Sequence, residues 1–275
     1  MSKFNSRYLL RKRQFRSLTG VTPDVFKQMS DRLRPSWERA SKHKNRSGRP
    51  YSVGDLEDHL LVLLILYRCH ITQDFLACLY NVDKATICRA LRRIEKTAGR
   101  VLGVKRSILV TQEEAQALLI DATEQPIQRP KHKQRCYYSG KKKRHTIKAE
   151  IITTQEGRIV SVSKSAPGSV HDITIRRRGP PLPENARGHA DSGYQGYQKD
   201  HPALEIPYKK SKKKPLTKDE KEYNHALSRL RIRVEHAFAR MKRFRILSDR
   251  YRYPRPKHTA KFAIIASIAN IMAGF

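Results

Sequence analysis

Apolar residues recur at helical spacing through the first 105 residues of the chain. Thr22-Pro23-Asp24 combines an N-cap residue, a proline for the first helical position and an early acid, so it predicts the start of a helix. The segment 56–67 is strongly apolar but too short to cross a membrane, and we expect it to be the central helix of a small bundle. A basic, polar stretch over residues 39–49 predicts a linker before it.

Two further helical patterns, residues 71–80 and 82–96, meet at a tight break on Asn81. Asp83 can cap the second of them, whose inner face carries apolar residues at helical spacing. Basic and hydroxyl side chains lie on its outer face: Lys84, Thr86, Arg89, Arg92 and Arg93. Two short helices around a tight break, with such groups facing outward, describe a DNA-binding helix-turn-helix. An ordinary helical hairpin with a solvated basic face is the alternative interpretation.

From about residue 115 the pattern changes to short apolar runs separated by turns, which is typical of strands. We expect strands over residues 117–120, 145–154, 158–163, 187–191 and 205–209, with a hairpin connection at 155–157. We expect helices over residues 169–178, 217–244 and 257–273. Because strands come first and helices follow, this part predicts a mixed α/β sheet domain. The two patterns divide the chain into an all-α domain, 1–105, and an α/β domain, 106–275.

The charge of the chain points to a polyanionic partner. The 275 residues include 58 Lys and Arg against 25 Asp and Glu, a formal net charge of +33, while 38% hydrophobic residues suffice for a folded core. Such an excess repels itself unless a polyanion screens it, so nucleic acid is the expected partner. A metabolic enzyme for small neutral substrates is hard to reconcile with this balance. Basic runs at 131–148 and 209–214 are candidate contacts to a phosphate backbone, although a charge run is usually a solvated loop.

Nothing in the pattern predicts export or membrane attachment. Residues 1–17 are basic without the apolar core of a signal peptide, and the apolar stretch 262–275 is shorter than a membrane span. The four cysteines are Cys69, Cys78, Cys88 and Cys136. They show no C-x-x-C spacing, so we expect buried free thiols in a reducing compartment rather than a zinc site.

Three of the few acidic residues stand at positions that suggest catalysis. Asp121 follows an apolar run where a buried strand is expected to leave its sheet, and Asp191 ends another short run. Glu235 lies in the long predicted helix on the same face as Arg231 and Lys242, at the border of the apolar stripe. Three carboxylates gathered in this way repel one another unless a cation lies between them, and hard divalent ions prefer oxygen ligands. The trio therefore predicts a site for two Mg²⁺ ions, or Mn²⁺ in their place, that cleaves phosphodiesters.

Each acid also has an ordinary structural interpretation. A strand-end Asp is usually a turn former, and Glu235 four residues after Arg231 can be a plain helical ion pair. Asp172 fits a capping-box pattern and is expected to be a helix N-terminal acid first and a metal ligand second. His171 could touch the site, but a histidine of the capping turn is the simpler interpretation. Glu124 is expected at the surface. The combination of three acids in a basic chain favours the metal site.

Four segments carry a resemblance to a known family: Leu118-Leu119-Ile120-Asp121-Ala122-Thr123, Pro167-Gly168-Ser169-Val170-His171-Asp172, Ala190-Asp191-Ser192-Gly193-Tyr194 and Arg231-x3-Glu235-x6-Lys242-Arg243-Phe244. In this order they resemble the DDE transposases of the bacterial insertion sequence five group, which are related to Harbinger-type eukaryotic elements. The resemblance covers nearly the whole chain, including the helix-turn-helix. It implies an RNase H-like fold for the catalytic domain.

The resemblance also implies the site and the reaction. Asp121, Asp191 and Glu235 match the DDE triad that holds two Mg²⁺ ions, and Arg231 and Lys242 match basic residues that contact transposon-end phosphates. We therefore expect a DNA transposase whose N-terminal helices bind terminal inverted repeats. Cleavage at the ends would free a 3′-OH that attacks target DNA, and a homodimer or larger assembly would join the two ends. Such a protein would work in the bacterial cytoplasm at the nucleoid, or in the nucleus of a eukaryote.

Two other functions stay open from the sequence. A transposase-derived DNA-binding protein without catalysis predicts a damaged triad, whereas all three acids are present. An RNase H-like endonuclease that cuts without joining would carry the same residues. A covalent intermediate on Tyr194 or Tyr197 is disfavoured, because the expected reaction requires no covalent protein–DNA bond.

Overall fold

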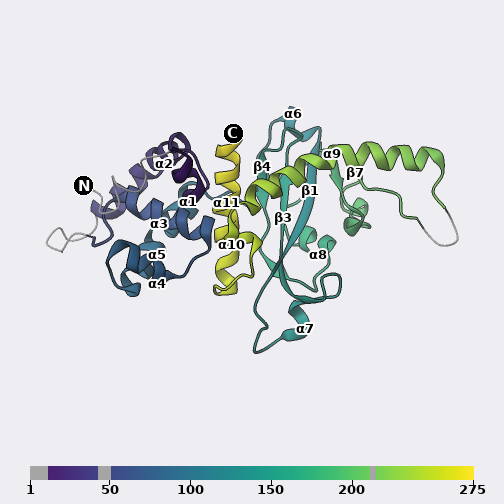
Figure 1. Ribbon diagram of the computed structural model, residues 1–275. Coiled ribbons are helices and arrows are strands. Elements are labelled where there is room, and N and C mark those ends of the chain that lie inside the picture. Colours follow the sequence, from purple (N-terminus) through teal and green to yellow (C-terminus); the bar gives the residue numbers. More distant parts are fainter. Residues whose placement is uncertain (1–11, 43–50, 211–214) are drawn as a thin grey trace. The chain divides into compact units, whose positions relative to one another are not determined.

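The computed structural model describes residues 12–42, 51–210 and 215–275, and the chain divides into two compact units (Figure 1). The first unit holds the described residues up to Gly103 together with Lys242–Asp249. The second holds almost all of the rest, Val104–Met241 and Arg250–Ala273. Within the described ranges, no helix is long and apolar enough to span a membrane.

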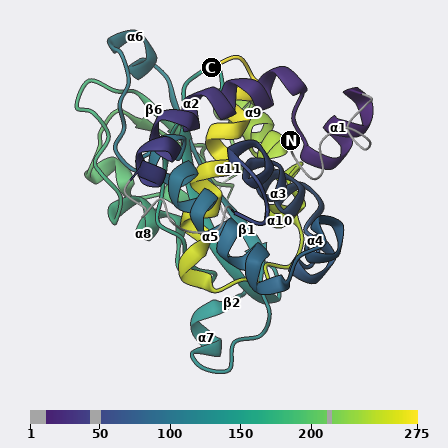
Figure 2. The ribbon, with the colours of Figure 1, turned by 90° about the vertical axis from the view of Figure 1, so that its left-hand side faces the viewer.

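The first unit is a bundle of helices around a buried central one. Its helices are α1 (Lys12–Thr19), α2 (Pro23–Lys42), α3 (Leu56–Cys69), α4 (Gln73–Tyr80), α5 (Lys84–Val101) and the short α10 (Arg245–Ser248). Helix α3 packs against each of the other five (Figure 2). Its residues from Leu60 to Tyr67 are all buried. A helix surrounded in this way needs apolar residues on every face. The predicted central helix is confirmed.

Helix α2 begins as its sequence predicts. Its first residue is Pro23, and Thr22 Oγ1 accepts a hydrogen bond from the Val25 N–H at 3.4 Å. The linker predicted over residues 39–49 is wrong in its first part, because α2 continues to Lys42, and the remainder lies outside the described residues. Basic residues are good helix formers when they face water, so their presence did not mark the end of the helix.

Helices α4 and α5 form the predicted helix-turn-helix. Asn81 joins them in the left-handed conformation, with φ 49°, which Asn tolerates better than most residues. Asp83 is the N-cap residue of α5, although its side chain makes no capping hydrogen bond. The inner residues Ile87, Leu91 and Ile94 are buried. The basic face of α5 therefore points away from the core of the bundle.

The second unit is a mixed sheet with helices packed beside it. Its strands are β1 (Leu118–Pro126), β2 (Tyr138–Ser139), β3 (Arg144–Thr153), β4 (Ile159–Val162), β5 (Ala166–Pro167), β6 (Gly188–Ala190) and β7 (Leu204–Glu205). In the order β4-β3-β1-β6-β7 the first three strands are antiparallel, whereas β1, β6 and β7 run parallel. The short strands β2 and β5 also pair with β3. An antiparallel trio continued by two parallel strands is the RNase H-like arrangement, so the expected α/β fold class is confirmed.

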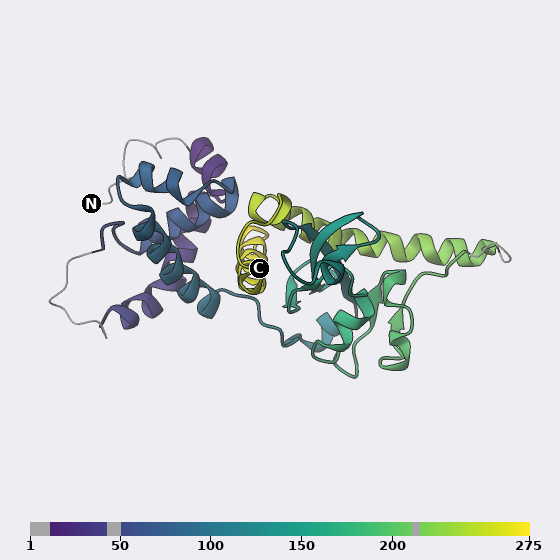
Figure 3. The same cartoon turned by 90° about the horizontal axis from the view of Figure 1, so that it is seen from below.

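Helices α9 and α11 lie beside this sheet (Figures 1 and 3). The helices of the second unit are α6 (Gln112–Ala115), α7 (Gln134–Tyr137), α8 (Asp172–Arg177), α9 (Lys218–Lys242) and α11 (His258–Met272), with 3-10 turns at Ser192–Tyr194, Tyr197–Lys199 and Arg255–Lys257. Near the start of α9, Tyr223 Oη donates to Glu205 Oε2 of β7 at 3.3 Å. Near its end, Arg240 Nη2 donates to Gly157 O, between β3 and β4, at 2.7 Å. Helix α9 therefore crosses the sheet, which brings its middle turns to the central strands.

Several predicted positions change in the structure. Strand β1 runs on to Pro126, so Asp121 lies inside a strand rather than at its end, because the pairing with β3 continues. The strand predicted at 205–209 is only two residues long. Cys78 and Cys136 are exposed, so the expectation of four buried thiols is wrong, although all four cysteines are free.

The buried His258 joins α11 to the sheet and makes the stability of this unit sensitive to acid. Its Nε2 forms a hydrogen bond with Gln125 Oε1 of β1 at 2.9 Å, and its Nδ1 forms one with Ser165 Oγ at 2.7 Å. Burial, with a smaller contribution from the charge of Lys261, lowers the pKa of His258 to about 4. Folded and unfolded chains are equally deprotonated above the ordinary His pKa of about 6.5. As the pH falls from there toward 4, the unfolded chain binds the proton first, and we expect a loss of up to about 3 kcal/mol.

Urea unfolding at about pH 7.5 and about pH 4.5 measures this loss, with the variant His258→Gln as the comparison. Because glutamine cannot titrate, the free energy of unfolding of the His258→Gln variant should change less between the two pH values. His132 is exposed, and His132→Gln is the matched control. An equal pH dependence in wild type and His258→Gln would contradict the prediction.

Candidate active site

Two aspartates meet where two parallel strands run side by side. Strands β1 and β6 pair with Ile120 opposite Ala190, so the next residues, Asp121 and Asp191, stand at matching positions. Burial sets this register, because Ile120 and Ala190 are completely buried and a slip by one residue would expose them. Asp191 then leaves the strand and caps a 3-10 turn, where its Oδ1 accepts the Gly193 N–H at 2.8 Å. The structure thus brings together two of the predicted catalytic acids.

One guanidinium lies between both carboxylates. Arg231 Nη2, from the middle of α9, is 3.9 Å from Asp121 Oδ2 and 3.9 Å from Asp191 Oδ2. Its buried Nε makes no hydrogen bond with the described residues. At such distances the charges attract without the short paired hydrogen bonds of a strong Arg–carboxylate pair. Both Oδ2 atoms therefore leave room for a closer cation.

Burial governs the charge state of the two aspartates. It raises the pKa of Asp121 to about 6, against the attraction of Arg231, and the negative charges of Asp191 and Asp172 add to the rise. Burial also opposes ionisation of Asp191, but hydrogen bonds from its own turn, followed by the charges of Arg231 and Lys141, lower its pKa. An ionised Asp121 at neutral pH is thus costly even beside Arg231, and a closer positive charge would reduce this cost.

A second cation lies between two further acids. Lys148 Nζ of β3 is 3.3 Å from Glu124 Oε1 of β1 and 3.1 Å from Asp172 Oδ1 at the start of α8. Glu124 and Lys148 face each other directly across the two strands. Glu124 also accepts a hydrogen bond from Thr146 Oγ1 at 2.9 Å, and its side chain is largely buried. The predicted surface position of Glu124 is therefore wrong, because an opposite charge on β3 compensates its burial.

Asp172 lies close to the paired aspartates and is the N-terminal acid of a helix, as the sequence predicts. Helix α8 begins at Asp172 with His171 as its N-cap residue, so Ser169 does not cap it and the predicted capping box is wrong. A Cβ on Gly193 would lie 2.9 Å from Asp172 Oδ2, so the Asp172 carboxylate touches the turn that follows Asp191. The side chain of His171 is exposed.

Sequence reasoning missed a buried ion pair near these acids. Arg176 Nη1 of α8 donates to Glu150 Oε1 of β3 at 2.7 Å, and the two side chains are only 1% and 2% exposed. Burial raises the pKa of Glu150, although the charge of Arg176 opposes the shift, and Asp121 adds to it. Tyr194, of the turn after Asp191, is buried beside Glu150. The available signal was an acid at position 150 directly between the apolar residues Ala149 and Ile151.

The third predicted triad residue stands apart from this group. Glu235 is exposed on α9, one turn beyond Arg231. Across the described part of the chain, no three His, Cys, Asp or Glu side chains form a group that could hold a metal ion. The place of Glu235 in the triad stays a prediction. Lys242, the last residue of α9, is exposed and belongs to the first unit.

The predicted DNA contacts on α5 differ in their accessibility. Lys84, Arg89 and Arg92 are exposed, whereas Thr86 and Arg93 are half-buried. The Arg93 guanidinium lies over the Tyr51 ring, 4.1 Å from its centroid, in a cation–π contact within the first unit. We therefore expect Arg89 and Arg92 to reach DNA more readily than Arg93.

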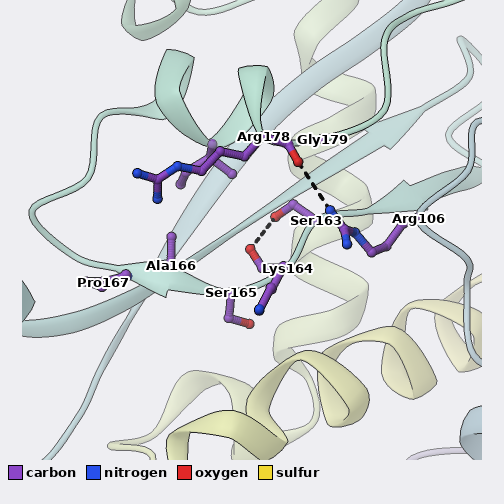
Figure 4. Close-up of a pocket in the computed structure, with 9 residues that line it drawn as sticks. Arg106, Ser163, Lys164, Ser165, Ala166, Pro167, Arg178 and Gly179 are labelled. Atoms are coloured by element: carbon purple, nitrogen blue, oxygen red, sulfur yellow. Dashed lines mark hydrogen bonds between the residues drawn. The ribbon is translucent and has the colours of Figure 1, made fainter.

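A separate basic hollow of the second unit has a structural explanation (Figure 4). Arg106, Lys164 and Arg178 are its basic residues. Arg106 Nη2 donates to the carbonyl oxygen of Arg178 at 3.3 Å, and Ser163 Oγ donates to that of Lys164 at 3.2 Å. The first of these bonds connects the chain before β1 with the end of α8, and the second is local to the segment after β4. The lining includes no acid of the aspartate site.

Gly168, in the segment Pro167–Asp172, permits a close approach of backbone to backbone. A Cβ at this position would lie 2.9 Å from Thr146 O and 3.0 Å from Tyr137 O. Because these backbone atoms cannot move aside cheaply, Gly168→Ala is expected to lower the free energy of unfolding by about 1–3 kcal/mol. Urea unfolding measures the change, with Gly140→Ala as the control, since nothing lies within 4 Å of a Cβ there. Equal costs at the two glycines would contradict the packing argument.

The mixed sheet sets two aspartates side by side next to one cation, and the same chain carries a helix-turn-helix. This combination is the architecture of RNase H-like enzymes that act on nucleic acids. The family model described as DDE superfamily endonuclease matches residues 120–270, and that of the helix-turn-helix of DDE superfamily endonuclease matches residues 52–102. The chain belongs to the DDE superfamily of endonucleases.

Two relatives are named as transposases. The chain is 32% identical, over 263 residues and 94% of each chain, to the probable transposase for insertion sequence element IS702 of Microchaete diplosiphon. It is 27% identical, over 235 residues and 84% of each chain, to the putative transposase for insertion sequence element IS112 of Streptomyces albus G. No solved structure matches the chain significantly. The expected resemblance to DDE transposases is confirmed, while the insertion sequence five group stays a prediction.

Proposed function

We propose that the protein is a DNA transposase that binds the terminal inverted repeats of an insertion sequence, cleaves DNA at those ends and joins them to target DNA. The observation that carries this proposal is the pair of Asp121 and Asp191 on adjacent strands, with Arg231 Nη2 3.9 Å from each. The net charge of +33 and the helix-turn-helix match support binding to double-stranded DNA. Both named relatives are insertion-sequence transposases by their descriptions.

Two of the three proposed ligands, Asp121 and Asp191, present oxygen atoms that suit divalent metal ions. In each aspartate the Oδ1 accepts a backbone N–H, which leaves the Oδ2 facing Arg231. Hard cations such as Mg²⁺ and Mn²⁺ prefer carboxylate oxygens. We propose that Asp121, Asp191 and Glu235 hold two such ions. When bound, the ions would activate the attacking oxygen and stabilise the leaving oxygen of an in-line phosphodiester displacement.

The residues around the aspartates have separate roles in this proposal. In the protein without metal or DNA, the charge of Arg231 compensates the two carboxylates. If metal ions compensated them instead, Arg231 could contact a phosphate of the transposon end. Lys148 holds Asp172 beside the turn that follows Asp191. Asp172 and His171 would lie around the metal ligands and orient them. Lys242 contacts a further end phosphate.

Recognition of the ends falls to the first of two domains, 1–105 and 106–275. In this proposal the exposed face of α5 enters the major groove. Its candidate contacts are Lys84, Thr86, Arg89, Arg92 and Arg93. Because two ends must be joined in one event, we propose a homodimer or larger assembly on DNA. We place its action at the nucleoid in the bacterial cytoplasm, within the insertion sequence five group.

The test uses purified full-length protein, Mg²⁺ or Mn²⁺, and a labelled duplex that carries the ends of its own element. Metal-dependent cutting at the terminus, followed by joining to a supplied plasmid, is the expected result. Binding without cutting in either metal would favour a transposase-derived DNA-binding protein. Cutting without joining would favour an RNase H-like endonuclease. Denaturing gels separate the three outcomes by product size.

A further inference from the structure

Four arginine side chains of the first unit line one hollow. Arg13 and Arg16 come from α1, Arg68 from the last turn of α3, and Arg243 from the segment that follows α9. Asp24, at the start of α2, is the acidic residue among those that line it. The volume of about 480 Å³ lies within the range of ligand-binding hollows.

The frame of this hollow is held by buried packing and hydrogen bonds. Arg68 Nε donates to the Ser17 carbonyl oxygen of α1 at 3.3 Å, and Arg68 Nη1 donates to the carbonyl oxygen of Arg243. Phe244 is completely buried, and a Cβ on Gly20 would come within 3.0 Å of its ring. Gly20 has a φ of 82°, which favours glycine. These contacts fix the segment after α9 against α1, so Arg16 and Arg243 are held near each other.

The positive charge of the hollow is only partly compensated by the described residues, since four arginines share their lining with the single acid Asp24. None of the four arginines forms an ion pair with a carboxylate in the described ranges. Partial burial lowers the pKa of Arg243, and the charges of Arg16 and Arg68 lower it further. Guanidinium groups brought together in this way repel one another unless an anion lies among them. The hollow is therefore suited to an anionic ligand.

We infer that this arginine hollow binds phosphates of the double-stranded DNA backbone, as a contact additional to the face of α5. Guanidinium groups match phosphate oxygens in paired hydrogen bonds, which makes arginine the preferred residue for this ligand. The net charge of +33 and the helix-turn-helix match favour an extended polyanion over one small ion as the ligand of these four side chains. The helix-turn-helix match at 52–102 includes Arg68 but not the other three. The inference rests on the proposed function, which supplies DNA as the polyanion.

The contact would also link DNA binding to the catalytic helix. Arg243 directly follows α9, the helix that carries Arg231 and Glu235. A phosphate bound in the arginine hollow would therefore hold the chain at the end of α9 in the DNA-bound protein. Because phosphate contacts carry no base information, this site would add affinity without sequence preference.

The experiment measures binding of the full chain to a labelled 30-base-pair duplex, about three helical turns of random sequence, over a series of salt concentrations. The double variant Arg16→Gln with Arg243→Gln removes two charges and leaves the structural Arg68 in place. Each lost phosphate contact should reduce the slope of log affinity against log salt by about 0.9. We expect a slope smaller by about 1–2 and affinity lower on the order of tenfold at physiological salt. Arg32→Gln, an exposed arginine of α2, is the matched control, and Arg243→Lys should keep most of the slope.

A second measurement uses chemical protection of the unaltered protein. It therefore does not depend on whether the double variant folds. Arg16 and Arg243 should react with phenylglyoxal in the free protein and be protected by the duplex, as read by mass spectrometry. Equal protection by inorganic phosphate at the same phosphate concentration would overturn the assignment to DNA backbone. An unchanged slope in a folded double variant, or no protection by DNA, would overturn the inference. Failure of the wild type to bind any duplex would instead overturn the proposed function.

Discussion

The variants Asp121→Asn and Asp191→Asn are each expected to cleave transposon-end DNA on the order of a thousandfold more slowly than the wild type. Asparagine keeps the size of the side chain and removes the negative charge, so the Oδ2 that faces Arg231 is no longer an anionic ligand. Affinity for the same duplex should stay unchanged, because the proposed recognition face lies on α5. Single-turnover cleavage rates and fluorescence anisotropy measure the two quantities.

Two further variants locate the third ligand. Glu235→Gln should lose as much activity as the two aspartate variants, whereas Asp172→Asn, which still lies beside Lys148, should lose much less. The reverse order would replace Glu235 by Asp172 in the triad. Cleavage at the wild-type rate by both Asp121→Asn and Asp191→Asn would refute the site itself.

Asp121→Asn should also raise the free energy of unfolding of the metal-free protein. The same measurement shows that this variant folds. Burial raises the pKa of Asp121 to about 6. The ionised carboxylate therefore costs folding free energy at pH values above 6, and this cost disappears below the ordinary Asp pKa of about 4. We expect a gain of about 1–3 kcal/mol near neutral pH and none in acid. Urea unfolding in a metal chelator, repeated at about pH 7.5 and about pH 4, tests both the sign and the pH window. A loss of stability at neutral pH would contradict the argument.

The variant Arg176→Met is expected to lower the free energy of unfolding by about 3–5 kcal/mol, because it leaves Glu150 buried without its partner. The double variant Glu150→Leu with Arg176→Met should cost much less, since it removes both charges and fills the space with apolar atoms. Arg177→Met is the matched control at the next position. Its ion pair with Asp200 is exposed, and pairs of that kind contribute less than about 1 kcal/mol.

The loss in Arg176→Met should itself depend on pH. Burial already raises the pKa of Glu150, and removal of the nearby positive charge raises it further. A carboxyl group with a raised pKa in the folded state weakens the fold most at high pH, and the penalty shrinks as the group becomes protonated. Urea unfolding should therefore show a larger loss at about pH 8 than at about pH 5. Equal losses in Arg176→Met and Arg177→Met, or no pH dependence, would contradict the role of this ion pair.

The helical half of the protein was predictable because its signals are local. The start of α2 depends on Thr22 and Pro23, and the break between α4 and α5 depends on Asn81, a residue that tolerates a positive φ. The buried strand segments that precede Asp121 and Asp191 could likewise be recognised from short apolar runs. Boundaries were less predictable, as the extension of β1 to Pro126 shows, because strand pairing with β3 decides them.

The pairing of charges around the site was not predictable from local signals. Lys148 and Glu124 are opposite each other only because of the register between β1 and β3. Glu150 meets Arg176 only because α8 packs on β3. Such contacts join residues far apart in the sequence, so no period or spacing along the chain reports them.

The sequence by itself determined the helical bundle, the helix-turn-helix, the α/β class of the second part and the two aspartates, since each depends on short-range pattern or on motifs in a given order. The tertiary structure alone decided which charges compensate one another. It put Arg231 between Asp121 and Asp191, and it included the segment after α9 in the first unit, where Arg243 joins three other arginines. The physical reason is that burial and distance set the strength of these interactions, and both exist only once the chain has folded.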